Sequence, residues 1–211
     1  MKIPLTYPKI PDGTNCPLKK CIAFEKLDGT NLHWVWDKGW RSFGTRRESY
    51  DYSDLGFQEF SDNHKLFGAA YYFGETYATK LEEFFLSKKE YTDAQVTVFT
   101  EFLGANSFAG QHEPNDHKKL ILFDVQVVND IISPEQFLSN FSKFPIAKVV
   151  YKGKYTGQFV EDVRNGKYPV NEGVVVKGVV DGQVYMTKVK TKAYMEKLKL
   201  QFKDKWQDYW E

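Results

Sequence analysis

The sequence has few of the residues that would mark a protein held together by metal ions or disulfides. It contains two cysteines, Cys16 and Cys21, and four histidines in 211 residues. A structural zinc site needs four ligands at characteristic spacings, and these residues do not have finger-like spacing. We therefore expect neither a disulfide framework nor a zinc site, and we treat all four histidines as structural.

Long apolar runs are also missing. The first residues, MKIPLTYPKIPDGTNCP, contain prolines where a signal peptide has an apolar segment. No stretch approaches the roughly 20 apolar residues of a membrane span. We expect no membrane partner and a cytoplasmic location, which would be the host cytoplasm if the chain is encoded by a virus.

An excess of one charge is the third absence. Lysine and arginine number 29 against 28 aspartates and glutamates, and the formal net charge is +1. This balance excludes a histone-like or tail-type nucleic-acid binder, but it leaves room for a local basic face. The hydrophobic fraction of 42% and the aromatic fraction of 17% are enough for a real core. Because no linker or repeat interrupts the chain, we expect a single domain over residues 1–211.

Strand patterns and turn signals alternate with helical patterns along this domain. Turns at Lys38-Gly39 and Asp181-Gly182 each separate two strand-like runs, which is typical of β-hairpins. The other expected strands are 20–26, 96–102, 120–128 and 148–151. Helices are expected at 64–89, from Ser133-Pro134 onward, at 158–165 and at 191–211. This order predicts an α+β fold of mainly antiparallel sheets flanked by helices.

Lys26 is the most informative candidate for chemistry. It ends the apolar run 21–24 and is followed at once by Asp28 and the turn formers Gly29 and Thr30. A lysine attacks phosphorus only as the neutral amine, whereas its usual pKa near 10.4 keeps it charged. Partial desolvation at a strand end, close to other cations, is a setting that lowers this pKa. Alone, Lys26 is more often a solvated turn lysine.

Five further segments follow in order, each near the end of a strand-like run. They are Ser42–Glu48 with two arginines, Val96–Gly104 with Glu101, Leu120–Val125 with Phe123, Asn171–Lys177 with Glu172, and Thr187–Lys190 with two lysines. Separately, these residues are ordinary surface, core or sheet-edge side chains. Those ordinary interpretations do not explain why the six segments occur in this order at strand ends.

The six segments together resemble the nucleotidyltransferase motifs of the covalent ligase superfamily, which includes RNA ligases, DNA ligases and mRNA capping enzymes. The segment Glu25-Lys26 followed by Gly29-Thr30-Asn31 is most similar to ATP-dependent RNA ligases. The similarity extends over residues 21–190. It implies the adenylation-domain fold of these ligases.

The resemblance also implies a role for each motif residue. Lys26 would be the nucleophile that takes AMP from ATP. Glu172 would help to organise a divalent metal ion, Mg²⁺ or Mn²⁺. The nucleotide-binding positions implied are Glu25 (adenine amino group), Asn31 (phosphates), Arg46 (nucleotide and 5′-phosphate), Glu101 (ribose), Phe123 (adenine stacking), Glu172, Lys188 and Lys190 (α-phosphate).

Two of these assignments have competitors in the sequence. Arg47 replaces Arg46 if the register of the second motif slips by one residue. Glu75, in Tyr72-Phe73-Gly74-Glu75-Thr76, also resembles the acid of the third motif, but it lies in a helical stretch. Glu101 follows a β-branched run and is therefore preferred.

The expected function is that of an ATP-dependent RNA ligase, which adenylylates itself, transfers AMP to a 5′-phosphate and seals this end to a 3′-hydroxyl. The expected partner is nucleic acid with such ends, above all RNA, as in RNA repair. We expect a monomer, with an accessory protein left open because residues 191–211 form only a terminal helix and no separate C-terminal domain is evident. Asp28 is also found in DNA ligases, so a small DNA ligase stays open. So do a GTP-using capping enzyme and, outside enzymes, a nucleotide- or nucleic-acid-binding module.

Overall fold

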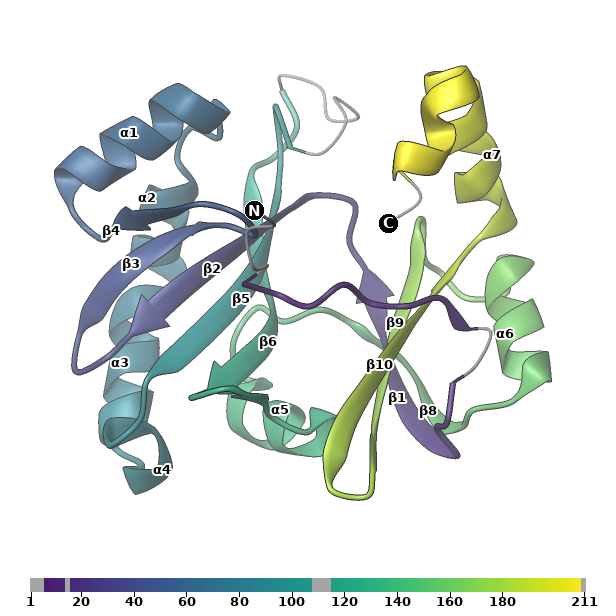
Figure 1. The fold of residues 1–211 in the computed structure, drawn as a ribbon, viewed down its shortest axis with the longest axis horizontal. Helices are drawn as coiled ribbons and strands as arrows, with labels where there is room; N and C mark the ends of the chain where they lie inside the picture. The colour runs from purple at the N-terminus through teal and green to yellow at the C-terminus, as the bar shows by residue number, and fades with distance from the viewer. Residues whose placement is uncertain (1–5, 14–15, 108–114, 210–211) are drawn as a thin grey trace, which may run out of the picture. The chain divides into compact units, whose positions relative to one another are not determined.

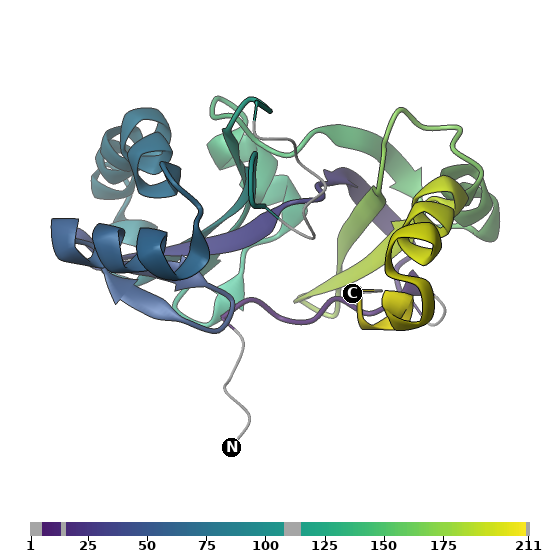
Figure 2. The same cartoon turned by 90° about the horizontal axis from the view of Figure 1, so that it is seen from above.

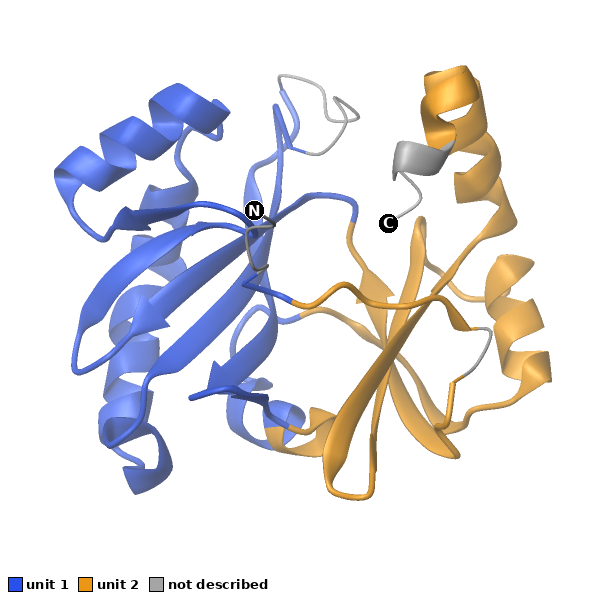
Figure 3. Ribbon diagram, viewed as in Figure 1, with its two compact units in different colours: residues 1–7, 28–132, 137–146 blue, residues 8–27, 133–136, 147–211 orange. Residues whose placement is uncertain are grey.

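A computed structural model describes residues 6–13, 16–107 and 115–209 (Figure 1). The chain divides into two compact units, coloured separately in Figure 3. Unit 1 comprises residues 1–7, 28–132 and 137–146, and unit 2 comprises residues 8–27, 133–136 and 147–211. Each unit contains one sheet. The expectation of a single domain over residues 1–211 stays a prediction.

Unit 1 is built on an antiparallel sheet with the strand order β4-β3-β2-β5-β6-β7. Its strands are β2 (Thr30–Trp36), β3 (Trp40–Thr45), β4 (Ser49–Asp51), β5 (Val96–Leu103), β6 (Lys119–Val127) and β7 (Asp130–Ile131). The predicted first hairpin is confirmed, because β2 pairs with β3 around a turn in which Lys38 and Gly39 both have positive φ.

The helices of unit 1 pack on one face of this sheet through aromatic side chains (Figures 1 and 2). Trp34 of β2 stacks on Phe73 with ring centroids 3.9 Å apart, and Phe43 of β3 contacts Phe60. Burying such rings is the main source of stability for this unit. The helices are α1 (Asp54–His64), α2 (Ala69–Phe73), the π-helix η2 (Gly74–Ala78), α3 (Thr79–Leu86) and α4 (Lys89–Thr92).

The expected helix over 64–89 is therefore interrupted. Gly68 has φ 89° and begins α2, and the π-helical turn begins at Gly74. Helix α1 was not predicted. It is marked by the Ser53 side chain, which accepts a hydrogen bond from the Gly56 amide, but only Gly56 and Phe60 of its residues are buried.

Unit 2 contains a four-stranded antiparallel sheet with the order β10-β9-β1-β8. Its strands are β1 (Lys20–Lys26), β8 (Val149–Lys154), β9 (Gly173–Val180) and β10 (Gln183–Lys190). Helix α6 (Gly157–Arg164) places Phe159 and Val163 in a core with Ala23, Val174 and Val176. All four strands were predicted, and so was the second hairpin.

The remaining elements are helical. Helix α5 (Pro134–Phe141) begins at the predicted Ser133-Pro134 signal, where the Ser133 hydroxyl accepts a hydrogen bond from the Gln136 amide. Helix α7 (Lys192–Phe202) and the 3-10 helix η4 (Lys203–Tyr209) form the expected terminal helix, whose residues 210–211 lie outside the described part. None of the described helices has the length and apolar character of a membrane span.

Candidate active site

Lys26 lies beside the first residue of β9. Its backbone pairs with Gly173, and on the opposite side Gly173 pairs with Lys190 of β10. Residues directly opposite each other in antiparallel strands project to the same face. The sheet register therefore brings the end of β1 and the end of β10 to the same position, with the start of β9 between them.

Glu172 joins the two lysines. Its Oε1 lies 2.8 Å from Lys26 Nζ and 3.1 Å from Lys190 Nζ. The side chains of Glu172 and Lys190 are 3% and 6% exposed, whereas that of Lys26 is 20% exposed. Two ammonium groups thus share one buried carboxylate, and of the three side chains Lys26 is the most accessible to a ligand.

The second carboxylate oxygen of Glu172 fits a metal ligand. Oε2 is buried, and no donor among the described residues reaches it. A buried acceptor without a partner is costly, and a hard cation or its water would satisfy it. No cluster of three or more His, Cys, Asp or Glu residues occurs among the residues that the structure describes. Other ligands of a metal bound here would then be phosphate oxygens and water, as is common for Mg²⁺.

Gly173 is what allows the three strands to meet at this point. Its φ of 151° lies in the region that favours glycine, and a Cβ at this position would collide with the Val189 carbonyl and lie 2.8 Å from the Lys190 Cα. A larger residue would push β9 away from the end of β10. The glycine after Glu172 in the sequence therefore sets the spacing of the lysines.

Lys188 and Lys177 continue this basic face of the sheet. Lys188 is 7% exposed, and its amide donates to the Pro11 carbonyl of the N-terminal segment. Lys177 is 2% exposed, and its Nζ lies 5.0 Å from the centroid of the Phe24 ring. The position of Lys188 is that of the motif lysine expected on the α-phosphate. Sequence analysis placed Lys177 only at the end of the Glu172 segment, without a role.

In unit 1 the turn after Lys26 is attached to Glu101. The Gly29 amide donates to Glu101 Oε1 over 3.1 Å, and Asn31 pairs directly with Glu101 across β2 and β5. A Cβ at Gly29 would collide with the Phe102 carbonyl, so only glycine permits this approach. Asn31 Oδ1 is buried and accepts no hydrogen bond from the described residues. The structure thus brings together the first and third motifs of the sequence.

Phe123 lies partly exposed on β6, against two other rings. Its centroid is 5.2 Å from that of Tyr7, which meets it edge-on, and 6.3 Å from that of Phe99. The Tyr7 hydroxyl donates a short hydrogen bond to the buried Asp124 carboxylate. Burial and the Asp124 charge hold the pKa of Tyr7 well above its ordinary value. Sequence analysis missed Tyr7, whose only signal was an aromatic residue in a proline-rich arm.

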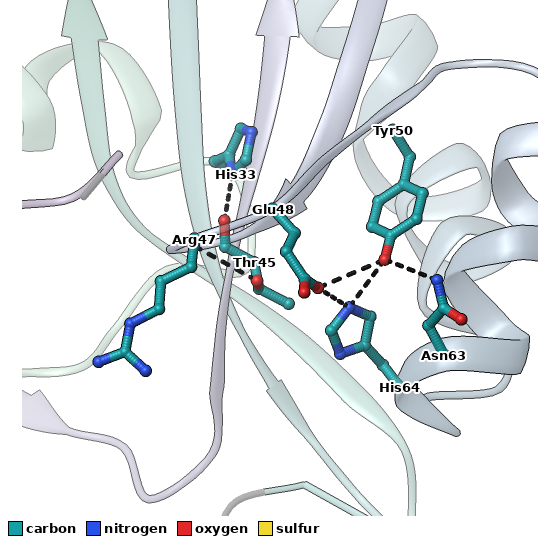
Figure 4. Close-up of polar contacts among 7 residues, drawn as sticks. All are labelled: His33, Thr45, Arg47, Glu48, Tyr50, Asn63 and His64. Carbon is teal, nitrogen blue, oxygen red and sulfur yellow. Dashed lines mark hydrogen bonds and ion pairs between the residues drawn. The ribbon is translucent and has the colours of Figure 1, made fainter. Parts of the chain in front are cut away.

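The same N-terminal segment holds Arg46. Arg46 Nη2 donates to the Tyr7 carbonyl over 3.3 Å, and the Thr6 amide donates to the Arg46 carbonyl over 3.0 Å. The alternative, Arg47, is exposed, and its side chain points away from the neighbouring Glu48 in Figure 4. The register that assigns Arg46 therefore gives the arginine that is built into the fold.

Two other sequence assignments lie apart from these groups. Glu25 is partly buried on the opposite face of β1 from Lys26, beside Val174, and its predicted contact with adenine stays a prediction. The competitor Glu75 is exposed on the π-helix η2. The predicted roles of the other site residues likewise rest on the resemblance, and the structure adds their positions.

The histidines take part in local contacts. His33 is 3% exposed, and its Nδ1 lies 2.9 Å from the Thr45 carbonyl oxygen. His64 Nε2 lies 2.6 Å from Glu48 Oε2 and 3.1 Å from the Tyr50 hydroxyl (Figure 4). His112 lies outside the described residues. The expectation of structural histidines fits His33 in particular, because it is buried against backbone.

The sequence profile of the RNA ligase family matches residues 19–190, which is most of the chain and includes every motif above. The chain belongs to the RNA ligase family. No curated protein was found to match it. The matched range begins just before β1 and ends at Lys190, the last residue of β10.

Solved structures agree with this family in fold. A Naegleria gruberi RNA ligase variant with ATP and Mn has a TM-score of 0.64 and 16% identity, over 93% of this chain and 59% of that one. An archaeal ATP-dependent RNA ligase has a TM-score of 0.61 and 16% identity, over 93% of this chain and 51% of that one. The predicted α+β adenylation-domain fold is confirmed. This family member spans less than two thirds of the length of these structures.

Proposed function

We propose that this chain is an ATP-dependent RNA ligase in which Lys26 carries AMP. The observation that carries the proposal is the sharing of the buried Glu172 carboxylate by Lys26 and Lys190. A nucleophilic lysine needs a second cation beside it to neutralise the phosphate that it attacks, and Lys190 supplies one. A solvated turn lysine would have no such buried partners.

The reaction has three steps. Lys26 Nζ, after losing a proton, attacks the α-phosphorus of ATP; a P–N bond forms and the bond to pyrophosphate breaks. An oxygen of an RNA 5′-phosphate then attacks the same phosphorus, so that the P–N bond breaks and AMP caps the 5′-end. A 3′-hydroxyl attacks the capped phosphate, the new phosphodiester forms and AMP leaves.

Glu172 has two roles in this scheme. As a carboxylate it holds Lys26 and Lys190 together before ATP binds, and this pairing keeps Lys26 in its charged form. Phosphates that draw Lys190 toward themselves loosen the pairing and let Lys26 release its proton. The Oε2 atom would hold Mg²⁺ or Mn²⁺, which supplies charge neutralisation and orientation of the phosphates when bound.

The residues of unit 1 are proposed to bind the nucleotide. Phe123 is partly exposed and has the shape to stack on a base, and the chemistry of Glu101 suits ribose hydroxyls. Arg46 offers a guanidinium to phosphate. Asn31 Oδ1 is a buried acceptor that a donor on the substrate would satisfy.

Covalent labelling tests the proposal. The protein is incubated with Mg²⁺ and ATP labelled in the α-phosphate, denatured, and separated on a gel. We expect a labelled band in the wild type and none in Lys26→Ala, whereas Lys80→Ala, an exposed lysine of α3, keeps the label. Absence of label in the wild type would overturn the proposal and favour a nucleotide- or nucleic-acid-binding module.

The substrate is decided by two further comparisons. GTP in place of ATP should give no label; preferential labelling by GTP would indicate a capping-type enzyme. Single-stranded RNA, nicked duplex RNA, nicked DNA and RNA–DNA hybrids are then offered as substrates. Sealing of RNA ends supports the proposal, whereas sealing of DNA nicks alone would indicate a small DNA ligase. We propose that a monomer suffices, and sealing that needs an added protein would contradict this.

A further inference from the structure

The two units carry opposite charge. Unit 2 has 17 lysines and arginines against 11 aspartates and glutamates, a formal net charge of +6, and unit 1 has 12 against 17, a net charge of −5. The near-neutral total of the chain hides this separation. A polyanion would therefore be attracted to unit 2.

Lysines gather on one face of the unit 2 sheet. Ala23, Val174, Val176 and Val189 point to the core under α6, so alternate residues point to the other face. The strand lysines on that face are Lys20 and Lys26 of β1, Lys152 and Lys154 of β8, Lys177 of β9, and Lys188 and Lys190 of β10. No strand position on this face is an aspartate or a glutamate among the described residues.

Three of these lysines lie beyond the candidate active site. Lys20, Lys152 and Lys154, here called the outer lysine patch, are all exposed. Lys20 and Lys154 stand directly opposite each other across β1 and β8, and Lys152 stands opposite Ile22. No ion pair or hydrogen bond joins the side chains of the patch to a described residue. Like charges directly opposite each other destabilise a sheet, so the arrangement needs an explanation.

Protection of the sheet edge explains only part of the patch. Strand β8 is at the edge of the sheet, and lysines on an edge strand discourage pairing with another chain. Lys152 and Lys154 fit this explanation. Lys20 does not, because β1 lies between β9 and β8 and has no free edge. An anion that bridges Lys20 and Lys154 accounts for both strands.

We propose that the outer lysine patch binds backbone phosphates of the RNA strand whose end is joined, an inference that rests on the proposed function. Lys20 and Lys26 are six residues apart on one strand, a distance of about 20 Å. A strand of RNA following this face would place a phosphate a few nucleotides from its end against Lys20 and Lys154. Contacts of this kind position the strand without reading its sequence.

The test compares two triple variants. K20Q/K152Q/K154Q removes the patch, and K80Q/K88Q/K89Q removes the same charge from exposed lysines of unit 1. Binding of a single-stranded RNA with a 5′-phosphate is measured by fluorescence anisotropy at several salt concentrations. Each lost phosphate contact lowers the slope of log K against log salt by about 0.7. We expect the patch variant to bind at least about tenfold more weakly, with a slope lower by about two, and the control variant to bind like the wild type.

Labelling with ATP separates this inference from the proposed function. Both triple variants should acquire AMP on Lys26 at the wild-type rate, because none of their substitutions contacts Glu172 or Lys190. A wild type that acquires no AMP contradicts the proposed function. A labelled wild type whose RNA affinity is equal in both variants overturns the inference alone. Aggregation of the patch variant with unchanged RNA binding, seen by light scattering, also overturns it and assigns the lysines to edge protection.

Discussion

Tyr7 and Asp124 are joined by a buried hydrogen bond although 117 positions separate them in the sequence. The bond fastens the N-terminal segment to β6 next to Phe123. The backbone of the same segment bonds Arg46 on both sides, through the Tyr7 carbonyl and the Thr6 amide. One short segment therefore positions two of the residues proposed to bind ATP.

Removing the Tyr7 hydroxyl should lower both stability and nucleotide affinity. In Tyr7→Phe, the buried Asp124 carboxylate loses a donor, which costs about 2 kcal/mol in the free energy of unfolding. The ring stays, so Phe123 keeps most of its packing, but its position is less fixed. We expect the KM for ATP in self-adenylylation to rise more than kcat falls. Urea denaturation and ATP titration measure the two effects.

Tyr185→Phe is the matched control, because Tyr185 is 40% exposed on β10. It should change neither quantity. The double variant Tyr7→Phe, Asp124→Asn should be less destabilised than the sum of the single variants, because both remove one interaction. Additive effects would show that the hydrogen bond does not couple the two residues.

The shared carboxylate makes a prediction about catalysis. Glu172→Gln and Lys190→Ala should each lower the rate of self-adenylylation at least about 100-fold, the scale of losing a charge-stabilising group. Glu161→Gln, an exposed acid of α6, is the control and should label normally. Near-normal labelling in both Glu172 and Lys190 variants would mean that the motif assignment is out of register.

Gly173→Ala should damage the same site without removing a charge. The added Cβ meets the Val189 carbonyl, and φ of 151° is unfavourable for alanine. We expect β9 to shift, Glu172 to separate from Lys190, and labelling to fall by about tenfold or more. Gly182→Ala in the hairpin turn is the control, since nothing lies within 4 Å of its Cβ. It has positive φ too, so equal loss in both variants would point to backbone strain alone.

The strands of the candidate site could be predicted from sequence because their signals are local. The Asp181-Gly182 turn fixes how β9 and β10 pair, and this pairing brings Lys190 to Gly173. The alternation of the strands then places Lys188 and Lys190 on one face. What the resemblance added was the chemistry expected of Lys26 and Glu172.

The contacts that were missed join segments that are distant in the sequence. Nothing near Tyr7 indicates Asp124, because their contact exists only after β6 is in the sheet. The same holds for the pairing of Lys20 with Lys154. Helix α1 was missed for another reason, since few of its residues are buried and the apolar periodicity is correspondingly weak.

The buried His33 predicts a pH dependence of stability. Burial lowers the pKa of His33 to about 4, although the hydrogen bond to the Thr45 carbonyl opposes the shift. In the unfolded chain the pKa is about 6.5. Between these values the unfolded state binds a proton that the folded state does not. The free energy of unfolding should therefore fall as the pH decreases from about 6.5 to about 4, by about 1.4 kcal/mol per pH unit at most.

The variant His33→Asn isolates this contribution. Asparagine keeps a side-chain amide that can donate to the Thr45 carbonyl but does not titrate in this range. Urea denaturation at pH 7, 6, 5 and 4.5 should show a flatter pH dependence in His33→Asn than in the wild type. His117→Asn, at an exposed position, should follow the wild-type curve. If His33→Asn and the wild type lose stability in parallel, His33 is protonated in the folded state over this range, and the fall must come from other groups.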